Sequence, residues 1–337
     1  MSNLLALRGP QFSIDTAVLC DTLASRLNAV VRVARGGDAL LTLRQARALR
    51  PEITTAKQVH AFGLNCLACA LAGGARRVVY SPVGFPRRAE VNWLRAAMNY
   101  RRIDVVCPSQ TVRRAMVSRG VAMSRTHVVR PGVSLGDFTP QRNEALRATL
   151  GYAPDDRVIF APLEPGHEAG LSLAAWSVSL LNVLDKRHRL LTAASESRAG
   201  IVENFCNRLI EPSLLTNVSH IPMQSLFGIA DAVLFTPTHD SGVSPVTLAM
   251  AMASGRPIVS TTLRSVCELI EDRHTALLVR DASPRLIAQR LEDCFADPQL
   301  AWKLTDRARA EVYDHFTRTK MLAELQGVYT DVASAGM

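Results

Sequence analysis

The sequence contains no long hydrophobic run. None of its apolar stretches reaches the roughly eighteen residues of a membrane-spanning helix, so no transmembrane segment is expected. The N-terminal stretch lacks the basic region and apolar core of a signal peptide, which favours a cytoplasmic protein. A chain of 337 residues with 48% hydrophobic and 20% charged residues can bury sizeable cores, and its length favours two domains.

Cysteines are few and do not form the pattern of a disulfide framework. There are seven, an odd number spread over the whole chain. Cys66 and Cys69 form a CxxC pair downstream of His60, but no second pair of ligands lies near them, so a zinc site is not expected. The run around them is rich in small apolar residues, and we expect both thiols to be buried in a helix packed on a sheet.

Aromatic residues make up only 5% of the chain, and acidic residues are scarce in its first part. Residues 1–140 contain 20 Lys and Arg against 7 Asp and Glu, whereas residues 141–337 contain 19 against 23, giving a formal net charge of +9. This basic part favours an anionic lipid surface or an acidic acceptor as partner, although the dominance of arginine over lysine can equally reflect a GC-rich genome. Without aromatic residues between the basic ones, no nucleic acid partner is expected.

Short apolar runs alternate with stretches of helical periodicity along the chain. This alternation predicts parallel sheets built from βαβ units in two successive domains. The strands expected in the first half are residues 4–7, 29–33, 58–61, 77–81, 104–107 and 127–130. Those expected in the second half are residues 157–161, 189–193, 218–221, 232–235, 257–260 and 276–279. Helices are expected between them, including 200–209 and 265–271, and Gly136–Arg142 is the expected linker.

The most specific pattern lies in residues 241–279. A loop of small residues leads into a helix that ends in Ala251-Met252-Ala253-Ser254-Gly255, followed by Pro257-Ile258-Val259, Glu268-Leu269-Ile270 and Ala276-Leu277-Leu278-Val279. In this order and spacing the segment resembles the donor-binding core of the retaining family-4 glycosyltransferases, the glycosyl transferases of group 1. Shorter fragments that resemble the same family are Ile229–Ala232, Thr236-Pro237, Val59–Ala61, Val78–Pro82 and Val128–Val133.

The resemblance implies an α/β fold of the GT-B type, in which two doubly wound Rossmann-like domains face each other across a cleft. Residues 1–138 would form the N-terminal, acceptor-side domain, and residues 139–317 the C-terminal, nucleotide-sugar-side domain. Residues 318–337 would form a C-terminal helix that crosses back to the first domain. The nucleotide-sugar is a substrate of such a protein, and no cofactor or metal is expected.

The resemblance also implies which residues surround the substrates. On the donor side, the loop before the helix at 245–254 would present backbone N–H groups and the positive end of the helix dipole to a diphosphate. The donor-binding residues that match the family positions are Ser241, Gly242, Val243, Ser244, Pro245, Met250, Glu268, Pro162 and Ala169. Those on the acceptor side are Gly9, His60, Val83 and Gly84. No catalytic residue is identified.

Several of these positions depart from the family pattern. Gly242 and Met250 stand where the family has two glutamates, the second of which bonds the ribose of the donor. Pro162 and Ala169 replace an arginine and a lysine that clamp the diphosphate, and Val83 replaces a histidine. Losing both cations removes charge-assisted hydrogen bonds from the donor site. The neighbouring polar residues that could replace these groups are His167, Glu168, His239, Asp240 and Glu268.

The leading hypothesis is a glycosyltransferase-like protein that transfers a sugar, with retention, from a nucleotide-sugar to a lipid, glycan or small acceptor. The alternative is a catalytically inactive GT-B homologue that acts as a binding or scaffold protein. The helix expected at 87–102 has basic pairs at both ends and two apolar stripes, which favour a position at the inner membrane surface. Packing of this helix on the first sheet is the other alternative, and the exposure of Trp93 separates the two.

Overall fold

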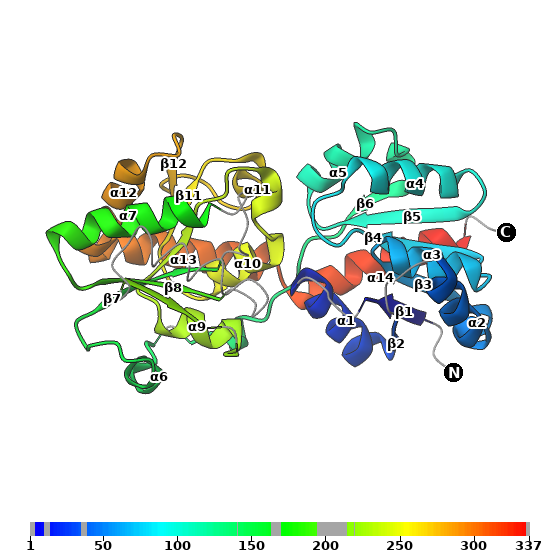
Figure 1. Ribbon diagram of the computed structural model, residues 1–337, viewed down its shortest axis with the longest axis horizontal. Helices are drawn as coiled ribbons and strands as arrows, with labels where there is room; N and C mark the ends of the chain where they lie inside the picture. Colours follow the sequence, from blue (N-terminus) through cyan, green and yellow to red (C-terminus); the bar gives the residue numbers. More distant parts are fainter. Residues whose placement is uncertain are drawn as a thin grey trace. The chain divides into compact units, whose positions relative to one another are not determined.

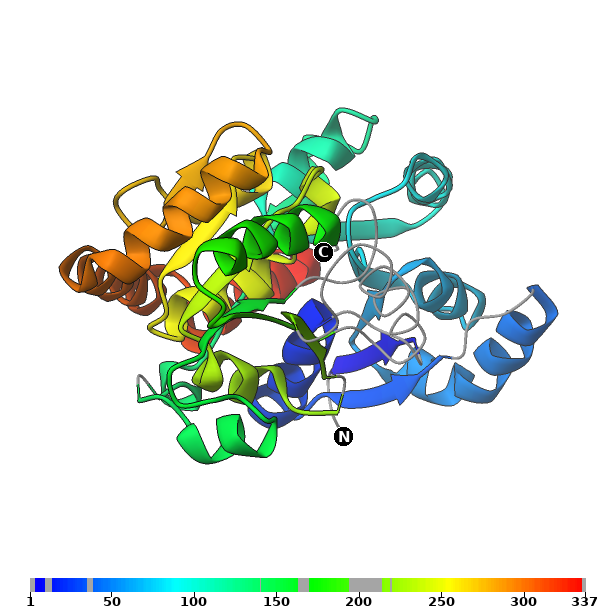
Figure 2. The same ribbon diagram turned by 60° about the vertical axis from the view of Figure 1, so that its left-hand side comes forward.

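A computed structural model describes residues 4–9, 14–34, 39–139, 141–162, 170–193, 214–218 and 220–334. The chain divides into two compact units, drawn in Figures 1 and 2. The first unit contains residues 1–132 and 316–337, and the second contains residues 133–315, so the division precedes the expected boundary after residue 138. Within the described residues each unit has one six-stranded parallel sheet. The expected fold class, two doubly wound α/β domains, is therefore confirmed.

The sheet of the first unit has the strand order β2-β1-β3-β4-β5-β6. All neighbouring strands run parallel. The strands are β1 (Leu4–Arg8), β2 (Val30–Val33), β3 (Gln58–Phe62), β4 (Arg77–Ser81), β5 (Arg102–Cys107) and β6 (Thr126–Val128). The helices are α1 (Ile14–Leu27), α2 (Ala39–Thr55), α3 (Leu64–Ala72), α4 (Arg88–Met98), α5 (Gln110–Val117), the short η1 (Met123–Arg125) and α14 (Arg318–Ser334).

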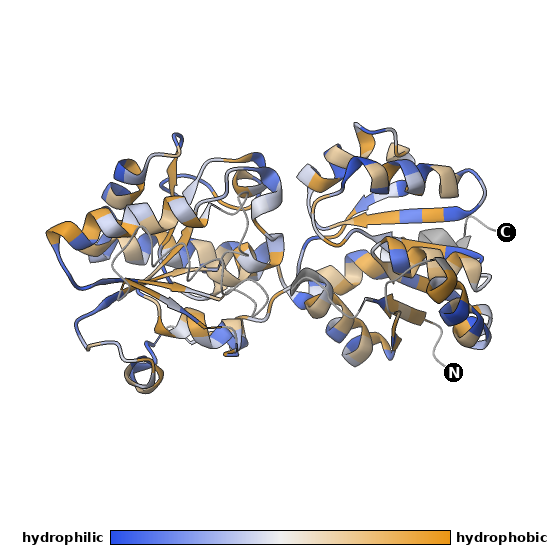
Figure 3. Cartoon of the chain, viewed as in Figure 1, coloured by the Kyte–Doolittle hydropathy of each residue, from blue (hydrophilic) through white to orange (hydrophobic). Residues whose placement is uncertain are grey.

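Helices cover both faces of this sheet, which is why its strands are mostly apolar, although β5 contains Asp104 (Figure 3). The helices α2 to α5 pack on one face with side chains such as Ile53 and Leu94. The helices α1 and α14 pack on the other face, where Leu325 is fully buried. Cys66 and Cys69 on α3 are each 1% exposed, which confirms the expected burial of both thiols. Burial raises the pKa of Cys66 to about 12.

The helix α14 joins the first unit from the other end of the sequence. Met321 and Leu325 belong to the core between this helix and the sheet. The hydroxyl oxygen of Tyr329 lies 2.7 Å from Nδ1 of His60 on β3, and Nε2 of His60 lies 2.9 Å from Oγ of Ser81 on β4. His60 therefore connects two strands to α14 through both of its ring nitrogens.

The sheet of the second unit has the strand order β12-β11-β10-β7-β8-β9. If β7 to β12 are numbered 1 to 6 and the sheet is read from β9, the order becomes 3-2-1-4-5-6. This is the strand order of dinucleotide-binding folds. The strands are β7 (Arg157–Ala161), β8 (His188–Thr192), β9 (Leu215–Asn217), β10 (Ala232–Phe235), β11 (Ile258–Thr261) and β12 (Leu277–Val279). The helices are η2 (Leu135–Asp137), α6 (Glu144–Thr149), α7 (Leu171–Leu184), α9 (Met223–Ile229), η5 (Asp240–Gly242), α10 (Pro245–Ala253), α11 (Arg264–Cys267), α12 (Pro284–Ala296) and α13 (Pro298–His315).

Some expected elements of the second unit differ from the structure. The third strand of this unit was expected at 218–221, but β9 spans Leu215–Asn217 and ends before Val218. Its side chains are only half-buried at the edge of the sheet, so it lacks the apolar run by which buried strands are predicted. The helix expected at 265–271 is the four-residue α11. The expected linker overlaps η2 and belongs to the second unit. The helix expected at 200–209 lies outside the described residues.

The burial of His60 makes the stability of the first unit dependent on pH. Burial lowers the pKa of His60 to about 3, from 6.5 for an exposed histidine. The unfolded chain binds a proton at His60 as the pH falls below 6.5, whereas the folded chain excludes it. The stabilisation is therefore complete above pH 6.5, and the free energy of unfolding should fall by up to about 1.4 kcal/mol per pH unit between pH 6.5 and 3.

Urea unfolding at about pH 7.5 and about pH 5 measures this loss. His60→Gln disturbs the bonds to Tyr329 and Ser81 and should be less stable than the parent at the higher pH. Because glutamine cannot titrate, this variant should lose less stability on acidification. His274→Gln removes an exposed histidine and is the matched control, which should keep the pH dependence of the parent. Equal pH dependence of the parent and His60→Gln would contradict the assignment.

Candidate functional site

The strand order of the second unit changes direction between β7 and β10. In open parallel sheets, ligands bind outside the carboxyl ends of the strands at such a switch point. The strand β7 ends at Ala161 and is followed by Pro162, and β10 ends at Phe235 and is followed by Thr236 and Pro237. The candidate site is therefore the carboxyl edge of this sheet.

Gly170, at the start of α7, is in direct contact with Thr236 at the end of β10. The hydroxyl of Thr236 donates a hydrogen bond to the carbonyl oxygen of Gly170 at 2.8 Å. A Cβ atom at Gly170 would lie 1.8 Å from the carbonyl oxygen of Thr236, and the φ angle of Gly170 is +71°. Only glycine tolerates both the positive φ angle and the lack of space for a Cβ atom. The end of β10 and the start of α7 are therefore in backbone contact at the switch point.

The expected donor loop forms the connection between β10 and α10. It contains Ser241, Gly242, Val243, Ser244 and Pro245. The Oγ atom of Ser244 accepts a hydrogen bond from the backbone N–H of Thr247 at 3.2 Å, and Pro245 occupies the first turn, as is typical of a helix start. The structure thus brings all five residues to the N-terminus of a nine-residue helix, where the dipole favours an anion.

Bonds from the neighbouring strand fix the shape of this loop. The hydroxyl of Thr261, at the end of β11, donates to the carbonyl oxygen of Pro237 at 2.7 Å. The carboxylate of Asp240 accepts a hydrogen bond from the backbone N–H of Ser265 at 2.9 Å, which connects η5 to α11. Asp240, expected as a replacement polar group, therefore binds the backbone of its own unit, and His239 beside it is exposed.

Met250 lies in α10, and its side chain is buried. Its side chain is 2% exposed, and every residue of α10 from Val246 to Ala253 is buried. Its assignment to donor contact is corrected here, because the side chain packs in the core of the unit. Glu268 is half-buried at the end of α11, and Pro162 is buried directly after β7. The remaining donor-side candidates His167, Glu168 and Ala169 lie outside the described residues.

The acceptor-side candidates lie in the first unit. Gly9 follows β1, and Val83 and Gly84 follow β4, so these three lie at the carboxyl edge of the first sheet. The side chain of Val83 is 39% exposed, and a Cβ at Gly84, whose φ is +84°, would meet open space. His60 is 0% exposed within β3. Its assignment to acceptor contact is corrected, because both ring nitrogens are already bonded inside the core.

Sequence reasoning assigned no part in shaping these edges to Gly63, Gly170 or Thr236, although Thr236-Pro237 was one of the fragments that resemble the family. Gly63 follows β3 with a φ of +80°, and a Cβ there would lie 3.2 Å from Cγ2 of Val83. A glycine next to an expected strand or helix was the available signal, but many glycines share it. Among the described residues, no group of three His, Cys, Asp or Glu side chains is arranged to hold a metal ion.

Residues 181–297 match the family model of the glycosyl transferases group 1. The chain is 29% identical over 226 residues to D-inositol 3-phosphate glycosyltransferase of Paenarthrobacter aurescens, covering 64% of this chain and 53% of that protein. It is 26% identical over 217 residues to the protein of the same name from Jonesia denitrificans, covering 59% of this chain and 50% of that protein. The chain thus spans about half the length of the curated relatives it matches.

Solved structures share the fold across nearly the whole chain. Anabaena HepE in complex with UDP and glucose superposes with a TM-score of 0.83 at 14% identity, covering 98% of this chain and 100% of that one. WaaG, a glycosyltransferase involved in lipopolysaccharide biosynthesis, superposes with a TM-score of 0.70 at 12% identity, covering 95% and 97%. These likenesses show the GT-B fold, and with the family match they confirm the resemblance to the glycosyl transferases of group 1.

Replacing Gly170 by alanine tests the backbone contact at the switch point. Gly151→Ala is the matched control, since Gly151 has a φ of +80° but no heavy atom within 4 Å of an added Cβ. Both variants should lose about 1–2 kcal/mol from the positive φ. Gly170→Ala should lose about 1–3 kcal/mol more, because the chain must move away from Thr236. Urea unfolding measures both, and equal losses would contradict the close contact.

Proposed function

We propose that this GT-B protein, whose second unit carries the pattern of group 1 glycosyl transferases, binds a nucleotide-sugar at the carboxyl edge of its second sheet and transfers the sugar with retention. One arrangement carries the proposal: the small-residue loop 241–245 stands at the N-terminus of α10, beside the switch point between β7 and β10. Anabaena HepE, which has the same fold and whose structure contains UDP and glucose, supports it.

The loop supplies backbone groups rather than charged side chains to the reaction. Transfer breaks the bond between the anomeric carbon of the sugar and a diphosphate oxygen, and the leaving diphosphate gains negative charge. The N-terminus of α10 and its dipole would stabilise that charge. A hydroxyl of a lipid, glycan or small acceptor would form the new bond to the anomeric carbon and would pass its proton to the leaving diphosphate. Gly9, Val83 and Gly84 of the first unit are the residues expected on the acceptor side. The proposal needs no metal ion.

An inactive homologue that binds a ligand or a protein partner is the second candidate. The observation in its favour is the pair of positions that hold glutamates in the family. One is Gly242, which has no side chain, and the other is Met250, which is buried in the core. Such a protein would bind a nucleotide-sugar through the loop without transferring the sugar.

Binding of a donor should stabilise the protein against heat. A nucleotide-sugar at 100 times its Kd adds about 2.7 kcal/mol to the free energy of unfolding, and a panel of UDP-, GDP- and ADP-sugars measures this as a rise in Tm. Ser241→Asp places a negative charge on the exposed part of the loop and should weaken binding about tenfold or more, because it repels the diphosphate.

Ser25→Asp is the control for this variant, since it places the same charge on the surface of α1 in the first unit. It should bind the donor as the parent does. An unchanged Tm with every nucleotide-sugar of the panel would contradict donor binding. A rise in Tm without release of sugar from the donor, in the presence of lipid and glycan acceptors, would favour the inactive homologue.

The helix α4 and the residues just after it expose two aromatic side chains. Val91 and Leu94 are fully buried, so one stripe packs on the first sheet. Trp93 is 40% exposed, and Tyr100, just beyond the helix, is 84% exposed. The exposed arginines on this helix and at its ends are Arg87, Arg88, Arg95 and Arg101. Aromatic rings beside several cations favour an anionic lipid surface, and we propose that the first unit binds one at the inner membrane face.

Vesicle binding tests this surface. None of the helices in the described ranges is long and apolar enough to cross a membrane, so attachment would depend on about 1 kcal/mol per basic residue near the lipid. The protein should sediment with anionic vesicles more than with neutral ones, and salt should release it. Trp93→Ser with Tyr100→Ser should reduce binding, whereas Trp302→Ser, which removes a 65% exposed tryptophan of α13, should not. Equal sedimentation with anionic and neutral vesicles at low salt would contradict the proposal.

A further inference from the structure

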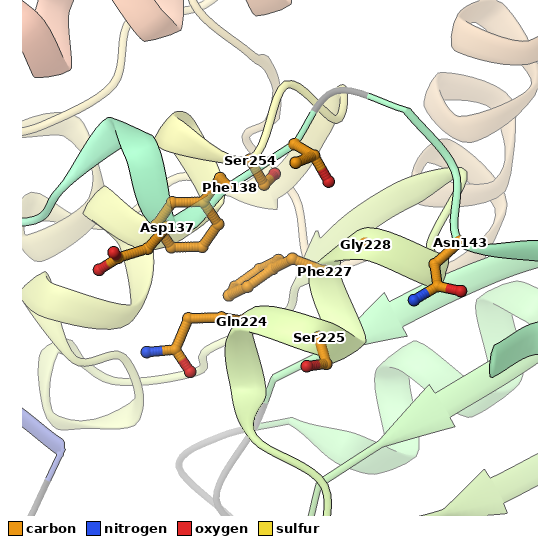
Figure 4. A pocket seen from close by; sticks show the side chains of 9 residues that line it. Asp137, Phe138, Asn143, Gln224, Ser225, Phe227, Gly228 and Ser254 are labelled. Atoms are coloured by element: carbon orange, nitrogen blue, oxygen red, sulfur yellow. The ribbon is translucent and has the colours of Figure 1, made fainter.

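The second unit has a hollow of about 160 Å³ that is not part of the candidate donor site (Figure 4). Gly228 lies in it near the end of α9, before β10 begins at Ala232, and Ser254 lies in it at the end of α10, before β11 begins at Ile258. Both positions are therefore at the amino edge of the sheet, whereas the loop before α10 is at the carboxyl edge. The hollow is a separate feature of the unit.

Neutral polar groups surround the hollow. The side-chain oxygen of Asn143 accepts the backbone N–H of Leu146 at 3.0 Å, which caps α6 and leaves its amide N–H groups to donate. Within the part of the chain that the structure describes, no hydrogen bond occupies the amide of Gln224 or the hydroxyls of Ser225 and Thr139. The lining thus offers both donors and acceptors that carry no charge.

The floor of the hollow is aromatic. The rings of Phe138 and Phe227 meet edge to face with centroids 6.0 Å apart, and Figure 4 shows them between the side chains of Gln224 and Ser254. Phe227 is fully buried and Phe138 is 6% exposed, so a small edge of Phe138 lies beside the amides and hydroxyls. This lining suits a small molecule that has C–H groups and several hydroxyl groups.

The charges around the hollow exclude an anionic ligand. The guanidinium of Arg256 already donates to the carbonyl oxygens of Phe227 at 3.3 Å, Gly228 at 3.1 Å and Gln141 at 3.3 Å. The charged side chain in the lining is the carboxylate of Asp137, which repels phosphates. A hollow of about 160 Å³ is also smaller than the roughly 300–1,000 Å³ of pockets for larger ligands, so a nucleotide does not fit.

We propose that this hollow is an accessory site for one neutral sugar unit. The amides of Asn143 and Gln224 and the hydroxyls of Thr139 and Ser225 bind its hydroxyl groups, and its C–H face packs on Phe138. The site is independent of the donor loop, since it lies at the other edge of the sheet. It therefore binds sugar whether or not the protein transfers one.

Gly228 lines the hollow and accepts an added side chain without a steric clash. A Cβ at Gly228 meets no heavy atom within 4 Å, and its φ is not in the positive region, so Gly228→Leu places a side chain in open space within α9. Gly327→Leu is the matched control, because Gly327 lies inside α14 of the first unit and its Cβ also meets nothing within 4 Å. Both substitutions favour the helix.

The experiment titrates D-glucose, D-galactose, D-mannose and N-acetyl-D-glucosamine into the full chain and follows the side-chain amide signals of Asn143 and Gln224 by NMR. At least one sugar should shift both signals at millimolar concentration. Gly228→Leu should weaken the binding of that sugar about tenfold or more, and Gly327→Leu should leave its affinity unchanged. Asn143→Asp keeps the cap of α6 but removes the amide donors, and it should also weaken binding.

Three results would overturn the proposal: no shift with any of the four sugars, equal affinity of the parent and Gly228→Leu, or an equal response to glycerol, which would show that the hollow does not distinguish a sugar. The rise in Tm with nucleotide-sugars is measured on the same variants. Gly228→Leu should keep the rise of the parent, so a failure of the accessory site and a failure of the donor site give different results.

Discussion

The contact between Gly170 and Thr236 is the constraint on which the carboxyl edge of the second unit depends. The strand order reverses at this point, so the chain leaving β7 and the chain leaving β10 must diverge from neighbouring strands. A missing side chain at Gly170 lets two backbones meet where a Cβ would lie 1.8 Å from an oxygen. After Thr236, the hydrogen bonds of Thr261 to Pro237 and of Ser265 to Asp240 connect the following segment to β11 and α11. The loop before α10 is therefore held from both sides.

This construction would allow the proposed donor site to bind a diphosphate without the charged side chains of the family. The positions of the two family glutamates are held by Gly242 and by the buried Met250, and neither offers a polar side chain. What remains is a helix start, with Ser244 as its cap and Pro245 in its first turn. Backbone dipoles of this kind cannot be removed by a single substitution while the helix exists, because they belong to the peptide groups themselves. The proposed site would therefore bind a diphosphate more weakly than a site with both cations, since charge-assisted hydrogen bonds are about twice as strong as neutral ones.

The first unit depends on a contact across almost the whole chain. His60 and Tyr329 are 269 residues apart, and their contact joins α14 to β3. Exclusion of water from this contact keeps the imidazole neutral, which is why burial lowers its pKa to about 3. His60 was expected on the acceptor side, but its neighbours in space come from α14 and β4. Its role is to position those elements.

The sequence alone determined the two parallel sheets, because strands buried on both faces are mostly apolar and stand out from the helices between them. It also determined the loop at 241–245 and the start of α10, since serine followed by proline before a buried run encodes a helix N-terminus locally. It did not reveal β9, whose half-buried residues lack an apolar pattern, nor the burial of Met250 and His60. The partners of Gly170 and the hollow beside Gly228 were decided by tertiary structure alone, because each depends on which distant backbone lies opposite a missing side chain.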